Sequence, residues 1–196
     1  MKSKLIMFIA LIGLSVMFSS CAKLPQVQID AVTAAIDSVK SVGGDVFVPE
    51  VYKALTDSLE ATKAKVETER AKWFPSYKKE VASLDLLSQT AFDALVKTEA
   101  RKAELKAEND ALVTEVKGLI VSNGELLKKA PKGKEGREAL VAIKADLELA
   151  TTTVTEAESL IANGDILGAN SKLKAVKEKV SSIKVELETA ITKVKK

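Results

Sequence analysis

The fold is decided by residues 77–122, which read YKKEVASLDLLSQTAFDALVKTEARKAELKAENDALVTEVKGLIVS. Apolar residues recur there at two positions of a seven-residue repeat, the pattern of a helix that packs against other helices along one stripe. At 1.5 Å per residue, the stretch predicts one helix of about 45 residues, roughly 70 Å long. The first position holds Leu84, Ala91, Thr98, Leu105, Leu112 and Leu119, and the second holds Val81, Ser88, Leu95, Lys102, Asn109 and Val116.

Two polar residues, Lys102 and Asn109, interrupt the second position of the repeat. A polar residue in such a seam fixes the register of the packed helices or marks a place where the bundle opens to water. Together with the small residues Ala91 and Thr98, they predict a loosely packed seam.

Two shorter helices are predicted before the long one. The first ends at Gly43-Gly44, where a left-handed residue is readily adopted, and the second begins near Pro49, whose missing N–H is unpaired in a first turn anyway. Pro75 then either reverses the chain or kinks one continuous helix. The first stripe is Val32, Ala35, Ile36, Val39 and Val42, and the second is Tyr52, Leu55, Leu59, Thr62, Val66 and Trp73.

Three aromatic residues, Trp73, Phe74 and Tyr77, surround Pro75. They could form a stacking platform for a sugar or a partner helix, or the packed corner at which the chain turns. Because aromatic clusters at helix corners usually belong to the core, we expect the packed corner.

Beyond the long helix, Asn123-Gly124 predicts its end, and the following segment with Pro131, Gly133 and Gly136 predicts a linker. The linker region carries the basic residues Lys128, Lys129, Lys132, Lys134 and Arg137. They could contact anionic polymers or lipid head groups, but a solvated linker is the more ordinary explanation.

Two more helices with three-four apolar spacing close the chain, joined at Asn163-Gly164-Asp165. Gly164 can end one helix and Asp165 can accept the first N–H groups of the next, so the pair predicts an antiparallel hairpin. The whole sequence therefore predicts an all-α fold, an elongated antiparallel bundle of coiled-coil hairpins with about five helices after a signal peptide. The expected regions are a signal peptide (1–20), a tether (21–28), an N-terminal helical region (29–122), a linker (123–137) and a C-terminal hairpin (138–196).

The N-terminal residues have the pattern of a secretory signal. Lys2 and Lys4 precede an apolar stretch, residues 5–18, which as a helix would span about 20 Å, short of the roughly 30 Å hydrocarbon layer. Phe18-Ser19-Ser20-Cys21 then resembles the lipobox of bacterial lipoproteins, although Phe18 stands where Leu or Val is usual. The resemblance implies cleavage between Ser20 and Cys21 by signal peptidase II and lipidation of Cys21, the only cysteine. Because Ala22 is not the Asp that retains many such proteins in the inner membrane, it also implies the periplasmic face of the outer membrane.

A second resemblance covers residues 29–102. Gly43-Gly44-Asp45-Val46-Phe47-Val48-Pro49-Glu50 before an Ala/Leu-rich helix is similar to a helical domain of unknown function in Gram-negative envelope lipoproteins, which usually has a small residue where Val48 stands. It implies an envelope helical lipoprotein and brings no catalytic residues.

The composition argues against catalysis, metal binding and nucleic-acid binding. The chain has no His, and its single Cys excludes an internal disulfide or a CxxC metal site. The 30 basic residues nearly balance the 27 acidic ones, so no global charge favours nucleic acid. We therefore predict no enzyme, no cofactor and no metal site.

The sequence predicts a lipid-anchored envelope protein with a structural, spacer or protein-docking role. Its partners would be the membrane, through the N-terminal lipid, and an envelope protein that the sequence does not identify; regular heptads also permit a homo-oligomer. The alternative is a carrier whose bundle opens to hold lipid or another apolar ligand.

The C-terminus offers a further alternative. Thr192-Lys193-Val194-Lys195-Lys196 is similar to the end of the murein lipoprotein, with Val194 in place of an aromatic residue. By that resemblance Lys196 would be the peptidoglycan attachment residue. The ordinary explanation is that these lysines favour the negative end of a helix.

Overall fold

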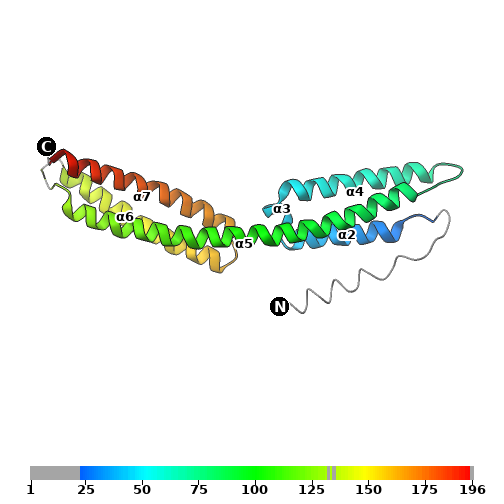
Figure 1. Cartoon of the computed structure of the whole chain (residues 1–196), viewed down its shortest axis with the longest axis horizontal. Helices are drawn as coiled ribbons and strands as arrows, with labels where there is room; N and C mark the ends of the chain where they lie inside the picture. The colour runs from blue at the N-terminus through cyan, green and yellow to red at the C-terminus, as the bar shows by residue number, and fades with distance from the viewer. Residues whose placement is uncertain (1–22, 132, 134–135, 195–196) are drawn as a thin grey trace. The chain divides into compact units, whose positions relative to one another are not determined.

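The computed structural model describes residues 23–131, 133 and 136–194, and within these residues the fold is entirely helical (Figure 1). None of the described helices combines the length and the apolar character that a membrane crossing needs. The predicted all-α class is confirmed. The helices are α2 (Gln26–Ser41), α3 (Gly44–Phe47), α4 (Pro49–Arg70), α5 (Lys78–Lys129), α6 (Gly136–Ala162) and α7 (Ile166–Val194).

The chain divides into two compact units, and the boundary between them falls inside α5, after Val96. Unit 1, residues 23–96 of the described chain, contains α2, α3, α4 and the first part of α5. Unit 2, from residue 97 onward, contains the rest of α5 with α6 and α7. Each unit has its own apolar core. The division therefore lies within the predicted N-terminal region and not in the predicted linker.

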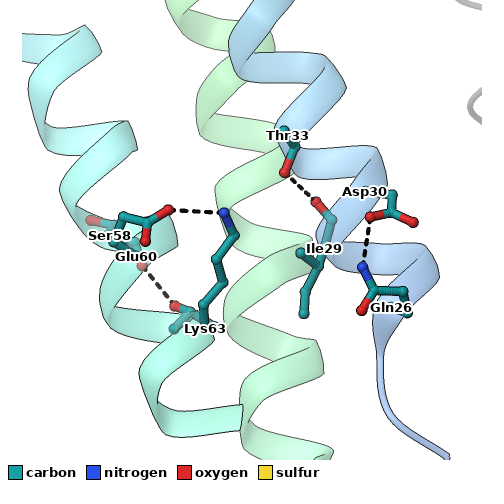
Figure 2. A network of polar contacts seen from close by, with 8 residues as sticks. Gln26, Ile29, Asp30, Thr33, Ser58, Glu60 and Lys63 are labelled. Atoms are coloured by element: carbon teal, nitrogen blue, oxygen red, sulfur yellow. Dashed lines mark hydrogen bonds and ion pairs between the residues drawn. The ribbon is translucent and has the colours of Figure 1, made fainter. Parts of the chain in front are cut away.

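Unit 1 is a bundle in which α2, α4 and the start of α5 share one core. Figure 2 shows that α2 and α4 run in opposite directions. In this view α2 rises from Gln26 to Thr33, whereas α4 descends from Ser58 to Lys63. Most residues of the apolar stripes predicted for α2 and α4 pack in or against this core; Val42 is half-buried outside it and Trp73 is exposed. The buried apolar residues of the core are Ile29, Val32, Ile36, Val39, Leu55, Leu59, Val66, Tyr77, Leu84, Leu87, Ala91 and Ala94.

The turn between α2 and α4 requires both of its glycines. Gly43 has a left-handed φ of +84°, as predicted for the helix end. Gly44 is needed for space, because a Cβ there would lie 2.3 Å from Val39 Cγ1 and 2.9 Å from the Val39 carbonyl oxygen. Pro49 occupies the first turn of α4, also as predicted.

Pro75 lies in a reversal of the chain and not in a kinked helix. α4 ends at Arg70 and α5 begins at Lys78, and both pack into the core of unit 1. The segment between them, residues 71–77, is a non-helical loop at one end of the bundle (Figure 1). Of the two alternatives left open by the sequence, the structure selects the reversal.

In unit 2, α6 and α7 form the predicted hairpin against the C-terminal part of α5. Gly164 has a φ of +87°, and Asp165 Oδ1 accepts the Gly168 N–H at 2.9 Å, so both residues act as expected. The buried core consists of Leu112, Val116, Ala130, Ile143, Leu147, Ala150, Val154, Ala157, Ala169, Leu173, Val180, Ile183 and Leu187.

The predicted helix end at Asn123-Gly124 is wrong. α5 continues to Lys129, so the first half of the predicted linker is helical. The physical reason is tertiary: Asn123 is fully buried against α7, and packing overrides the local preference of Asn-Gly for a turn.

Candidate functional site

The predicted processing and attachment residues, Ser20, Cys21 and Lys196, lie outside the described residues. The described part of the chain has two other features that bear on function. One is a set of buried asparagines in unit 2. The other is a pair of exposed aromatic residues at one end of unit 1.

Asn109 is the centre of the buried polar set. Its side chain is fully buried, and its Nδ2 donates to the carbonyl oxygen of Ile166 at 2.8 Å. Its Oδ1 accepts from Nδ2 of Asn170, also at 2.8 Å. Of the two roles that a polar seam residue can have, Asn109 therefore has the first: it ties α5 to α7 and is not open to water.

Asn123 repeats this contact fourteen residues later. Its Nδ2 donates to the carbonyl oxygen of Val180 at 2.7 Å, and Val180 also lies fourteen residues after Ile166. In both contacts the α7 residue comes 57 positions after the α5 residue. The constant separation means that α5 and α7 run parallel and stay in one heptad register over two repeats. We call Asn109, Asn123 and Asn170 the asparagine clamp.

Lys102, the other predicted seam residue, lies differently. Its side chain is 28% exposed, and Nζ contacts Glu99 Oε1 at 3.2 Å on the same helix. A lysine stem can cover apolar surface while its ammonium stays hydrated. Lys102 therefore belongs to the edge of the seam and not to the clamp.

Ion pairs between helices surround the clamp on the surface of unit 2. Lys117 pairs with Glu158 at 2.6 Å and joins α5 to α6. The remaining pairs join α7 to its two neighbours: Lys174–Glu108 at 2.8 Å, Lys177–Glu115 at 2.9 Å, Lys172–Glu156 at 2.7 Å and Lys179–Asp146 at 2.8 Å. Exposed pairs each add at most about 1 kcal/mol, but their pattern disfavours other pairings of the helices.

Glu108 connects the surface pairs to the clamp. The hydrogen bond from Lys174 holds the pKa of the Glu108 carboxyl below its usual range, and a hydrogen bond from the Asn170 side chain acts in the same direction. Asn170 therefore links a surface carboxylate to the buried Asn109 amide. Polar contacts thus continue from solvent into the α5–α7 interface.

The second feature is the loop at residues 71–77 of unit 1. Trp73 is 90% exposed and Phe74 is 84% exposed, whereas Tyr77 is buried in the core. The prediction of a packed aromatic corner is therefore wrong for Trp73 and Phe74 and holds for Tyr77 alone. We call Trp73 and Phe74 the aromatic tip.

Glu69 braces this loop from the end of α4. Its carboxylate accepts a hydrogen bond from the Lys72 ammonium, and this bond holds the pKa of Glu69 below its ordinary value. The Ser76 backbone N–H and the charge of Lys79 act in the same direction. Glu69 therefore holds the first part of the loop, directly before the aromatic tip, through Lys72.

The lowered pKa of Glu69 gives a pH-dependent prediction. The brace is fully present above the ordinary pKa of a glutamate and is lost as the pH falls through the lowered value, because the protonated carboxyl no longer pairs with Lys72. The fluorescence anisotropy of Trp73, the only tryptophan, should fall in acid before the helices unfold. In Glu69→Ala it should be low already at neutral pH.

Glu67→Ala is the matched control for that measurement. Glu67 is on the same turn of α4 and pairs with Arg70 at 3.6 Å, and its side chain is 63% exposed. Its removal should leave the anisotropy of Trp73 unchanged. Equal anisotropy in Glu69→Ala and the unsubstituted protein would mean that Glu69 does not brace the loop.

Surface hollows in the described chain are shallow. One lies between α4 and α5 of unit 1 and is lined by Glu50, Val51, Ala54, Leu55, Ser58, Leu86, Leu87 and Thr90. Another lies between α5 and α6 of unit 2, beside Asp110, Val113, Thr114, Glu158 and Ile161. Among the residues that the structure describes, no group of three or more His, Cys, Asp and Glu side chains could hold a metal ion.

No known protein family, curated protein or solved structure matches this chain.

Proposed function

We propose that this chain is a lipid-anchored, non-catalytic helical protein of the cell envelope that serves as a spacer or docking surface on the periplasmic face of the outer membrane. The anchoring rests on the leader and on Cys21 after Ser19-Ser20. Fatty acyl chains on one residue suffice for this, because each buried CH₂ contributes about 0.8 kcal/mol and two chains anchor stably.

The observation that carries the spacer role is the way unit 2 is built. Three buried asparagines and several ion pairs between helices hold α5, α6 and α7 in one register. Such contacts favour a bundle with one fixed arrangement, which is what a spacer or a docking surface needs. The outward faces of these helices are rich in Lys and Glu, as solvated faces are.

The same observations favour the spacer over the carrier. A carrier requires a seam that opens to water, but Ala91, Thr98 and Asn109 are closed to solvent, and only Lys102 at the edge of the seam is partly exposed. The asparagine clamp would also have to break before α5 and α7 could separate around a ligand. The hollows in the described part of the chain are shallow grooves and give an apolar ligand little enclosure.

Replacing Cys21 by Ser tests the proposal. A hydroxyl does not replace the thiol in diacylglyceryl transfer, so the variant should remain an unlipidated precursor that incorporates no labelled palmitate. The measurements are palmitate incorporation, mature size and partition into a detergent phase.

Ser20→Ala is the matched control, because it keeps a small residue directly before Cys21. It should be labelled and cleaved as the unsubstituted chain is. If Cys21→Ser is labelled with palmitate and reaches the size of the mature protein, the proposed anchor is wrong.

A further inference from the structure

The aromatic tip lies outside the apolar core of unit 1 and is exposed to solvent. Trp73 and Phe74 lie in the loop between α4 and α5, and they are the two most exposed of the large apolar side chains in the described chain. Within this loop, Lys72 pairs with Glu69 at the end of α4. The two large apolar side chains that follow Lys72 face solvent.

The tip lies at the end of unit 1 at which the described part of the chain begins. Because α2 and α4 run in opposite directions, the start of α2 and the end of α4 are at the same end of the bundle (Figures 1 and 2). Leu24, just before α2, packs against the core of unit 1. Cys21 is three residues before Leu24, and three residues span at most about 11 Å.

The charges around the tip suit an anionic surface. Lys23, Lys78 and Lys79 lie at this end of unit 1, and Lys72 is paired with Glu69. Of the other acidic residues nearby, Glu67 pairs with Arg70, Glu80 is buried and Asp30 accepts a hydrogen bond from Gln26. Lysines near an anionic bilayer each contribute about 1 kcal/mol of attraction.

We propose that the aromatic tip is a second membrane contact, with Trp73 and Phe74 inserted into the headgroup region of the bilayer that holds the lipid on Cys21. The inference rests on the proposed lipid anchor. Trp is enriched at membrane interfaces because its ring is apolar and its indole N–H is polar, and Phe adds apolar area. A lipid on Cys21 would hold unit 1 at the membrane without fixing its orientation. A second contact from the 71–77 loop fixes its orientation.

Trp73 is the only tryptophan of the chain, so its fluorescence reports on the tip alone. The experiment uses the full acylated protein, purified from membranes and reconstituted into phosphatidylethanolamine and phosphatidylglycerol vesicles. Trp73 emission should shift to the blue relative to a chain that begins at Ala22, which has neither leader nor lipid, measured without vesicles. Acrylamide quenching should fall severalfold, and phospholipids brominated on their acyl chains should quench the emission.

The control moves the probe to the side of the same bundle. Phe92 is on α5 and 50% exposed, and it lies about 21 Å along the helix from Lys78. In Trp73→Phe combined with Phe92→Trp, the tip keeps an aromatic pair while the new tryptophan should remain open to acrylamide and unaffected by brominated lipid. Both substituted positions are exposed, so the fold should be unchanged.

Each other outcome overturns the inference in a recognisable way. If the protein floats with the vesicles but Trp73 stays open to acrylamide, the lipid anchor stands and the membrane contact is wrong. If Trp73 is protected from acrylamide but not quenched by brominated lipid, a second copy of the chain covers the tip. If the protein does not float with the vesicles, the proposed anchor fails and the inference fails with it.

Discussion

Replacing Val180 by Asp is expected to destabilise unit 2 by about 4 kcal/mol or more, because an unpaired carboxylate would replace an apolar side chain in a closed core. Val180 is fully buried, in the same cluster as Leu173 and Ile183. Its carbonyl oxygen also accepts the Asn123 hydrogen bond, so a shift of α7 at this residue would disturb the asparagine clamp. Denaturant unfolding followed by circular dichroism measures the decrease in the free energy of unfolding.

Val185→Asp is the matched control, because the same substitution is made on the same helix at a side chain that is 63% exposed. It should change the free energy of unfolding by about 0.5 kcal/mol or less. If the two variants unfold at the same denaturant concentration, the buried stripe of α7 does not face a core.

The seven-residue repeat is the part of the fold that the sequence predicts best. Leu84, Ala91 and Leu105, assigned to one heptad position, are all buried, and the turn residues Gly43 and Gly164 have the left-handed φ expected of them. These features are local or periodic, so they can be predicted without knowing what packs against the helix.

The end of α5 shows where local preference misleads. Asn123 falls in the same heptad position as Asn109 and Val116, one repeat further along. Continuing the register would therefore have placed it in the seam, whereas Asn-Gly as a local signal indicated a turn. Burial against Val180 decided the outcome, because a side-chain contact to α7 outweighs a weak turn preference.

The partners of the polar residues could not be predicted. The sequence does not show that Asn170 contacts Asn109, because the two residues are 61 positions apart. The exposure of Trp73 and Phe74 also depends on the path of the short loop between α4 and α5. Composition and spacing carry no information on such contacts, whereas they do carry information on helices.

Replacing Asn109 by Leu is expected to cost about 2–4 kcal/mol, because it leaves buried hydrogen-bonding groups without a partner. Asn170 Nδ2 would lose its contact at 2.8 Å, and the Ile166 carbonyl oxygen would lose the Asn109 donor. Replacing Asn109 and Asn170 together by Leu should cost about 1 kcal/mol or more less than the sum of the two single changes. Each single change leaves the remaining asparagine without its partner, whereas the double change removes both groups of this hydrogen bond. Denaturant unfolding of the three variants measures this coupling.

Asn163→Leu, in the turn between α6 and α7 where the side chain is exposed, controls for the change of residue type. Its effect should stay within about 0.5 kcal/mol. Strict additivity of the Asn109 and Asn170 changes would contradict the clamp, because residues in direct contact are expected to couple. A non-additive result would instead support a unit whose register depends on one buried polar contact, and any variant of α5 or α7 that shifts this register should weaken both asparagine-to-carbonyl contacts together.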